Sequence, residues 1–190
     1  EIAYALESLT NDRLMAQAGN ISEVARQDWV CGPGASVLMA PFTHIGKPSR
    51  FTDGSYGVYY AASSEATGIA ETAHHKAIFL AATNEPDMEL TMRVYKCQVI
   101  RPMLDIRGSA FAALHAADSY IASCAFAAEQ RKADVWGLLY RSVRHPEGMC
   151  IAVLRPPALT IPAQTKHLRY VWSGEHQRFT DFFEIRKIDS

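Results

Sequence analysis

Four residues of this sequence have types and spacings that suit chemistry on an anionic ligand: Arg50, Tyr60, Glu71 and Ser142. Tyr60 follows Arg50 by ten residues, and Glu71 follows Tyr60 by eleven. A guanidinium binds phosphate bidentately, and a tyrosine offers both a ring face and a hydroxyl. A carboxylate stabilises positive charge that develops on a reacting group. Together these side chains can bind an anion and assist a reaction that passes through a cation.

Other catalytic patterns are missing from the sequence. It has neither a Gly-rich phosphate-binding motif nor a Gly-x-Ser-x-Gly segment. The seven histidines include one adjacent pair, His74-His75, and no His-Glu-x-x-His motif. This scatter argues against a metal site and a metal-dependent hydrolase. The cysteines are equally far apart, which predicts four buried free thiols in a reducing cytoplasm, at Cys31, Cys97, Cys124 and Cys150.

The composition is typical of one globular domain, with 190 residues of which 48% are hydrophobic and 21% charged. The formal charge of −1 argues against nucleic-acid binding through bulk charge. Residues 1–95 carry 6 basic and 11 acidic side chains, whereas residues 96–190 carry 13 and 9. This difference produces either a polar cleft for an anion or two differently charged solvated faces. No apolar run suits a membrane span and the start does not resemble a signal peptide, so we expect a cytoplasmic location.

Helices and strands alternate along the chain without strict βαβ order, which predicts an α+β fold with mixed or antiparallel sheets and flanking helices. Asn20 and Glu23 form a capping arrangement at the start of one helix. The polar segment 41–53 is expected to be a long surface loop. Hydrophobic periodicity predicts helices over 3–16, 21–29, 65–82 and 118–131, and strands over 57–62, 89–99, 135–140, 149–154, 168–172 and 178–188.

Three of these elements are specified further. Ser63 and Ser64 can cap the helix that carries Glu71. Tyr59 and Tyr60 are neighbours on a strand, so only one of them can face a site. On the helix over 118–131 the expected buried stripe consists of Ile121, Cys124, Ala125 and Ala128.

The spacings Arg50–Tyr60–Glu71, with Tyr60-Ala61-Ala62-Ser63 and the later Tyr140-Arg141-Ser142-Val143-Arg144, resemble the RES-domain family. This family comprises the toxins of Xre–RES toxin–antitoxin modules and is named for Arg, Glu and Ser. The likeness covers residues 48–155 of a single domain over 1–190. One departure is Pro48-Ser49-Arg50-Phe51-Thr52 where many members have Gly-Gly-Arg-Trp-Asn; Thr52 cannot reproduce every hydrogen bond of an asparagine amide.

The resemblance implies an ADP-ribosyltransferase-like fold and an enzyme that consumes NAD+ as its substrate, without a metal. It implies that Glu71 stabilises the oxocarbenium-like transition state and that Arg50 anchors phosphate or ribose. Tyr60 would face the nicotinamide ring, and Ser142 would orient the nicotinamide carboxamide or the ribose. Arg144 is a further candidate for the phosphates. His75, four residues after Glu71, either contacts Glu71 or substrate or is a packed structural histidine.

The family likeness leaves several functions open. ADP-ribose can pass to a protein side chain, which is mono-ADP-ribosylation, or to phosphate or water, as in an NAD+ phosphorylase or glycohydrolase. A non-catalytic nucleotide-binding module is the alternative from another class. The likeness also implies an Xre-type antitoxin that carries the DNA-binding function. The chain itself is then expected to contact neither nucleic acid nor membrane, and a homodimer within the toxin–antitoxin complex stays open.

Overall fold

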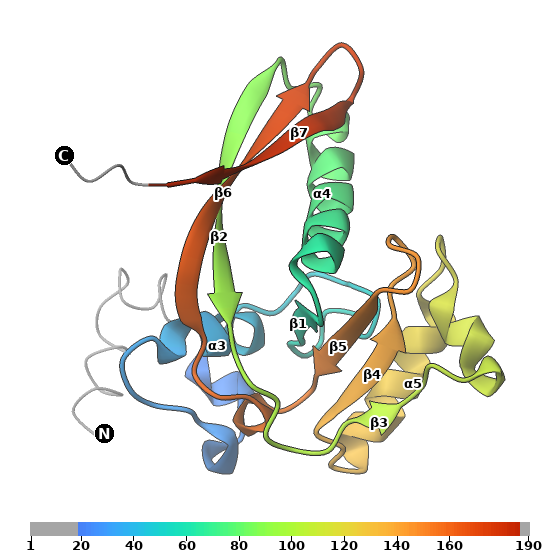
Figure 1. The fold of residues 1–190 in the computed structure, drawn as a ribbon. Helices are drawn as coiled ribbons and strands as arrows, with labels where there is room; N and C mark the ends of the chain where they lie inside the picture. The colour runs from blue at the N-terminus through green and yellow to red at the C-terminus, as the bar shows by residue number, and fades with distance from the viewer. Residues whose placement is uncertain (1–18, 187–190) are drawn as a thin grey trace.

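The computed structural model describes residues 19–186 and contains two β-sheets with helices packed around them (Figure 1). The first sheet has the order β1-β5-β4-β3, in which β3 and β4 are parallel and the other neighbours antiparallel. The second sheet has the order β2-β6-β7 and is antiparallel throughout. The strands are β1 Tyr59–Ala62, β2 Met88–Lys96, β3 Leu104–Asp105, β4 Gly137–Arg141, β5 Met149–Val153, β6 Ala163–Ser173 and β7 Arg178–Ile185. The predicted α+β class is confirmed.

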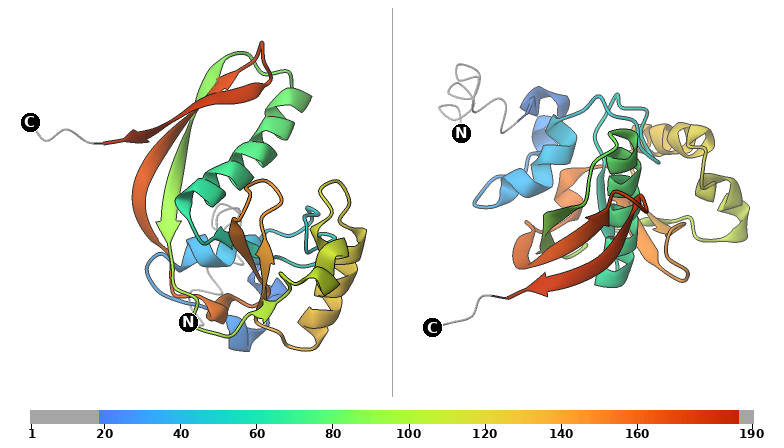
Figure 2. Two further views of the ribbon diagram at one scale, coloured as in Figure 1. Left: turned by 45° about the vertical axis from the view of Figure 1, so that its right-hand side comes forward. Right: turned by 90° about the horizontal axis from the view of Figure 1, so that it is seen from above.

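The α-helices of the described residues lie around these sheets (Figures 1 and 2). Helix α4 runs alongside the second sheet, α5 covers one face of the first sheet, and α3 covers its other face. Their bounds are α3 Ala35–Thr43, α4 Glu65–Ala82 and α5 Ile121–Lys132. Short 3₁₀ helices are η1 Ile21–Glu23, η2 Arg26–Asp28, η3 Ser109–His115 and η4 Pro156–Ala158.

Helix α4 has the bounds that the sequence predicts, because both of its ends are locally encoded. Ser64 is extended at the N-cap, and its Oγ accepts a hydrogen bond from the Thr67 backbone N–H at 3.2 Å. At the other end Asn84 has a φ of 51°, which stops the helix in the left-handed region. Glu71 therefore sits in the second turn of a well-defined helix.

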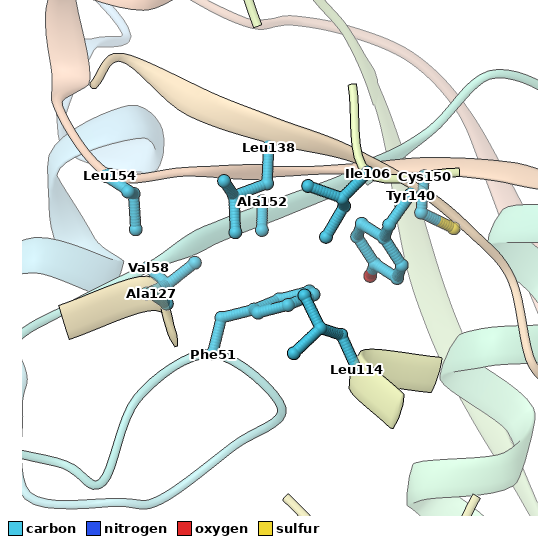
Figure 3. Close-up of a cluster of buried hydrophobic side chains, with 10 residues drawn as sticks. All are labelled: Phe51, Val58, Ile106, Leu114, Ala127, Leu138, Tyr140, Cys150, Ala152 and Leu154. Atoms are coloured by element: carbon cyan, nitrogen blue, oxygen red, sulfur yellow. The ribbon is translucent and has the colours of Figure 1, made fainter. Parts of the chain in front are cut away.

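The first sheet separates two hydrophobic clusters, and β1 contributes a tyrosine to each side. Tyr59 packs against the cluster around Val24 and Leu38, beneath α3. Tyr60 points to the other face, where its ring stacks on Phe51 with centroids 6.5 Å apart. Figure 3 shows this second cluster, in which Phe51 is fully buried and meets the ring edge of Tyr140 at 4.9 Å. The predicted separation of Tyr59 and Tyr60 is thus confirmed.

The first part of the described chain differs from the sequence prediction. Residues 21–29 do not form one helix but two 3₁₀ turns, because the buried Val24 between them is extended. The Asn20 cap is present: its side chain accepts from the Ser22 N–H and donates to Glu23. The predicted helix over 3–16 lies outside the described residues.

The segment 41–53 is a surface loop only in part. Its first three residues belong to α3, and the irregular segment begins at His44. Arg50, Phe51 and Thr52 are buried, because the Phe51 side chain enters the second cluster and draws its neighbours with it. The last part of the predicted exposed loop therefore belongs to the core, while residues 44–49 stay mostly exposed.

Two further expectations were wrong. Ile121 is 83% exposed, and the buried side of α5 carries Ser123 and Ala127 instead of the predicted stripe. The Ser123 hydroxyl donates to the Arg50 carbonyl at 2.5 Å, so a polar contact sets the rotation of this helix. Only Cys150 of the predicted buried thiols is buried; Cys97 and Cys124 are partly exposed and Cys31 is exposed.

We predict that Phe51→Ala lowers the free energy of unfolding by about 3–5 kcal/mol, because it removes a fully buried ring from the second cluster. Chemical denaturation followed by circular dichroism measures the change. Ile121→Ala is the matched control, since that side chain is 83% exposed and its loss should change stability by less than about 0.5 kcal/mol. Equal effects of the two substitutions would contradict the assignment of Phe51 to the core.

Candidate functional site

The centre of the candidate site is a hydrogen bond between two of the sequence-predicted residues. Ser142 Oγ lies 2.6 Å from Glu71 Oε1. Glu71 comes from the second turn of α4, and Ser142 follows directly after β4. Both side chains are half-buried. Tertiary folding therefore brings together a carboxylate and a hydroxyl that are 71 residues apart in the sequence.

The Ser142 hydroxyl has no hydrogen-bonding position left for a ligand. Its Oγ accepts from the backbone N–H groups of Arg144 and His145, at 3.1 and 2.9 Å. A hydroxyl has one proton and two lone pairs, so the remaining proton goes to Glu71. Ser142 thus orients the Glu71 carboxylate in this structure, whereas the resemblance implied a contact with nicotinamide or ribose.

The surroundings of Glu71 leave one of its oxygens available. The Cys150 thiol approaches Oε1 at 4.0 Å. Burial, together with the charge of Glu71, raises the pKa of Cys150 to about 11, so this thiol stays protonated at neutral pH. Within residues 19–186 the second carboxylate oxygen, Oε2, makes no hydrogen bond. A ligand hydroxyl can therefore donate to Oε2 while Ser142 holds Oε1.

Tyr60 is fixed through its hydroxyl and leaves ring surface exposed. The hydroxyl accepts from the Phe51 backbone N–H at 3.0 Å and lies 2.8 Å from Ser49 Oγ. Burial raises the pKa of Tyr60 to about 12, which keeps the phenol neutral. The side chain is still 37% exposed, so its ring offers a surface for a planar ligand group.

Arg50 is more enclosed than expected for a residue of a polar loop. It is 8% exposed, and its Nη1 donates to the carbonyls of Leu114 and Ala116 at 3.3 and 2.9 Å. The guanidinium lies over the Tyr120 ring, 4.9 Å from its centroid. Nε and Nη2 make no hydrogen bond within residues 19–186, which leaves two donors for a ligand.

Arg144 also donates a hydrogen bond to the backbone between η3 and α5. Its Nη2 donates to the Ala117 carbonyl at 2.9 Å. Arg50 and Arg144 therefore both bind the turn that connects η3 to α5, and Arg144 belongs to the segment that carries Ser142. Two cations therefore meet at this turn even though the chain is nearly neutral overall.

Of the adjacent pair His74-His75, His74 interacts electrostatically with Glu71 and Arg144. His75 is exposed, and its ring contacts the His74 ring at 5.5 Å. Burial and the nearby Arg144 lower the pKa of His74, while Glu71 and Asp118 oppose that shift. His74 is thus neutral at pH 7 and lies within the electrostatic reach of Glu71 and Arg144. Its spacing, three residues after Glu71, was the sequence signal that could have identified it.

Sequence reasoning also missed three residues around the site. Tyr140 is buried against Phe51, and its burial raises its pKa well above the usual value. Thr67 Oγ1 lies 3.0 Å from His145 Nδ1, which joins α4 to the segment after β4. Thr67 precedes Glu71 by four residues and so lies on the same helix face. Tyr140 and His145 carried no such spacing signal.

Thr52, which departs from the common family pattern, forms its side-chain hydrogen bonds within the turn over 52–56. Its hydroxyl donates to the Tyr56 carbonyl at 2.6 Å and accepts from the Gly54 N–H at 3.0 Å. The side chain is 3% exposed. Thr52 therefore shapes the segment that presents Arg50 and Phe51 and is saturated by backbone groups.

A groove lies on a face of α4 different from the one that carries Glu71. It has a volume of about 800 Å³ and runs between β1, β2, β6 and α4. Gly68, Ile69 and Thr72 line it from the helix, and most other lining side chains are apolar. Tyr60 and Cys150 border this groove, whereas Glu71 and Ser142 do not line it. It is not the polar cleft between segment 41–53 and the basic second half that charge distribution suggested.

Residues 19–186 show neither of two other structural features. No cluster of three or more His, Cys, Asp or Glu side chains there is arranged to hold a metal ion. No helix in the same range is long and apolar enough to cross a membrane.

Comparison with known proteins extends the likeness seen in the sequence. The RES domain matches residues 23–173, well beyond the 48–155 on which the motifs lie. The chain is also similar to the uncharacterized protein y4oC of Sinorhizobium fredii (strain NBRC 101917 / NGR234). The two are 31% identical over 188 residues, which cover 92% of this chain and 73% of that protein.

We predict that Arg50→Ala lowers the free energy of unfolding by about 2–4 kcal/mol, because it leaves buried carbonyl groups without a donor and removes packing on Tyr120. Arg50→Lys should lower the free energy of unfolding by less, since the lysine ammonium can donate to one of the two carbonyls. Denaturant unfolding measures both. Arg178→Ala, at an exposed position of β7, serves as the control. Wild-type stability of Arg50→Ala would show that the arginine does not support this turn.

Proposed function

The chain belongs to the RES-domain family, whose fold is ADP-ribosyltransferase-like, and we propose that it cleaves NAD+ at the nicotinamide–ribose bond and transfers ADP-ribose to an acceptor. One observation carries this proposal above the others. Glu71 is held by Ser142 through one carboxylate oxygen at 2.6 Å, while the other oxygen makes no hydrogen bond in the described part of the chain. A carboxylate held in this way suits the stabilisation of a cationic sugar.

The chemistry of NAD+ explains why a fixed carboxylate is useful. The nicotinamide is already cationic, so it leaves as a neutral molecule with the electrons of the C1′–N bond, and no strong acid is required. The ribose then carries oxocarbenium character. Glu71 Oε2 accepts a hydrogen bond from the ribose 2′-hydroxyl, and this hydrogen bond strengthens as positive charge develops on the ribose. A nucleophile then attacks C1′ and, where it is neutral, releases its proton.

The remaining residues of the site would bind the ligand. Arg50 offers Nε and Nη2 to the diphosphate, and Tyr60 offers its exposed ring to the nicotinamide. Arg144 supplies a second cation near the same turn. His74 lies within the electrostatic reach of Glu71 and Arg144. Substrate binding through Arg50 means that Arg50→Ala weakens NAD+ affinity as well as turnover.

The acceptor determines which enzyme this is. We favour a protein side chain as acceptor, which makes the chain a mono-ADP-ribosyltransferase. Phosphate or water as acceptor gives an NAD+ phosphorylase or glycohydrolase that depletes cellular NAD+. Because the electrophile is the same in all three reactions, the residues named above serve each of them. Product masses separate the branches: ADP-ribose bound to protein, ADP-ribose phosphate, or free ADP-ribose.

We predict that Glu71→Gln reduces nicotinamide release from NAD+ by roughly 10²–10³-fold, which corresponds to about 3–4 kcal/mol of transition-state stabilisation. The amide can still accept from Ser142, so the melting temperature should change little. NAD+ affinity should also change little, because the charge acts mainly in the transition state. Nicotinamide release, NAD+ titration and a melting curve measure the three quantities.

Glu129→Gln is the matched control, since it makes the same change at an exposed position of α5. Near-wild-type cleavage by a folded Glu71→Gln protein would refute the role of Glu71. Binding of NAD+ without any cleavage by the wild-type chain would favour the non-catalytic nucleotide-binding module.

We further propose that an Xre-type antitoxin restrains this enzyme and carries the DNA-binding function of the pair. The near-neutral charge of the chain supports the division, since sequence-specific DNA binders need clustered cations. The isolated chain should then show no specific operator binding at physiological salt, and the complex should bind NAD+ more weakly than the free chain. Gel-shift assays and NAD+ titrations test both. Tight operator binding by the chain alone would contradict the division.

A further inference from the structure

The segment 142–148, which follows β4, is attached to α4 through the Ser142–Glu71 hydrogen bond and also through the buried hydroxyl of Thr67. Thr67 is 1% exposed, and its Oγ1 lies 3.0 Å from Nδ1 of His145. The same Oγ1 lies 2.8 Å from the hydroxyl of Ser64, the N-cap of α4. The first turn of the helix is therefore connected through Thr67 to the middle of the segment.

His145 links this attachment to the candidate site. Its ring contacts Thr67, and its backbone N–H donates to Ser142 Oγ at 2.9 Å. On α4, Thr67 and Glu71 are one helical turn apart. The contacts thus form a closed ring that runs from Thr67 through His145 and Ser142 to Glu71 and back along the helix. Displacement of His145 would release one of the two backbone donors that fix the Ser142 hydroxyl.

Gly148 provides the space that this arrangement needs. A Cβ atom at position 148 would lie 2.8 Å from both Oγ1 and Cγ2 of Thr67 and 3.0 Å from Nδ1 of His145. Thr67 is β-branched and enclosed, so it cannot move aside easily. Gly148 also closes the segment on itself, since its carbonyl accepts from the Ser142 N–H at 2.8 Å. A side chain there would push Thr67 and His145 apart.

We propose that Thr67, His145 and Gly148 are positioning residues, here called the clasp, which hold segment 142–148 on α4 so that Ser142 meets Glu71. The clasp touches no substrate and acts through Ser142. Its effect on turnover rests on the proposed NAD+ cleavage, whereas its effect on the segment does not. Two experiments therefore separate the clasp from the proposed function.

The first experiment measures amide hydrogen exchange in the intact chain. Thr67→Val keeps the shape of the side chain and removes the hydroxyl. It should speed exchange of the Arg144 and His145 amides by about tenfold or more, because local opening of the segment becomes easier. Thr67→Ser should retain slow exchange. Thr83→Val is the control, since its hydroxyl bonds only the carbonyls of Phe79 and Leu80 at the far end of α4.

Gly148→Ala gives an independent route to the same result, because it inserts a methyl group between Thr67 and His145. It too should speed exchange at 144 and 145 while leaving exchange in β6 and β7 unchanged. Unaltered exchange at these amides in both Thr67→Val and Gly148→Ala would overturn the clasp, whatever the enzyme's activity.

The second experiment measures turnover of NAD+. Thr67→Val should lower kcat about tenfold with KM changed less than about threefold, since the loss affects orientation rather than ground-state binding. His145→Asn, which can place a donor or acceptor near the Nδ1 position, should retain more activity than His145→Gln. The double variant Thr67→Val with Ser142→Ala should be no slower than Ser142→Ala alone, because contacting residues in one network are non-additive.

The outcomes distinguish the two proposals. Additive losses in the double variant would overturn the claim that the clasp acts through Ser142. A wild-type chain that does not cleave NAD+ would refute the proposed function, and the clasp would then be decided by hydrogen exchange alone.

Discussion

Burial of the Phe51 side chain is the constraint on which the site depends. Its ring fills the space between the first sheet, η3 and α5. Two tyrosine hydroxyls bind its backbone: that of Tyr60 accepts a hydrogen bond from the Phe51 N–H, and that of Tyr56 donates one to the Phe51 carbonyl. Arg50 is thereby directed beneath the η3–α5 turn and Tyr60 is fixed by its hydroxyl. The same ring contacts Tyr140, two residues before Ser142. A hydrophobic anchor therefore places three polar site residues at once.

The Glu71 carboxylate depends on a different kind of support, built from hydrogen bonds rather than packing. Ser142 is saturated by two backbone donors, so its proton has a single destination. Such preorganisation matters because a carboxylate that is free to rotate loses orientation and entropy when it binds a cationic sugar. The rigid helix α4 and the clasp residues meet at this point, which explains why the polar contacts concentrate around the first two turns of the helix.

The distribution of cations shows how a nearly neutral chain can still favour an anionic substrate. Arg50 and Arg144 both donate hydrogen bonds to carbonyl groups of the η3–α5 turn, and within residues 19–186 each keeps further guanidinium nitrogens for other partners. Local arrangement rather than net charge therefore sets the potential near Glu71. The mostly apolar groove on the other face of α4 shares Tyr60 and Cys150 with this site but is not lined by Glu71 or Ser142.

The sequence by itself determined what depends on local interactions. The bounds of α4 followed from the Ser64 cap, the separation of Tyr59 from Tyr60 from strand alternation, and the family from spacings along the chain. Tertiary structure decided what depends on distant partners. Arg50 became buried because Phe51 enters the core, and Ser142 bonds Glu71 because segment 142–148 folds onto that helix. Periodicity cannot reveal such contacts, since they join residues that no local rule relates.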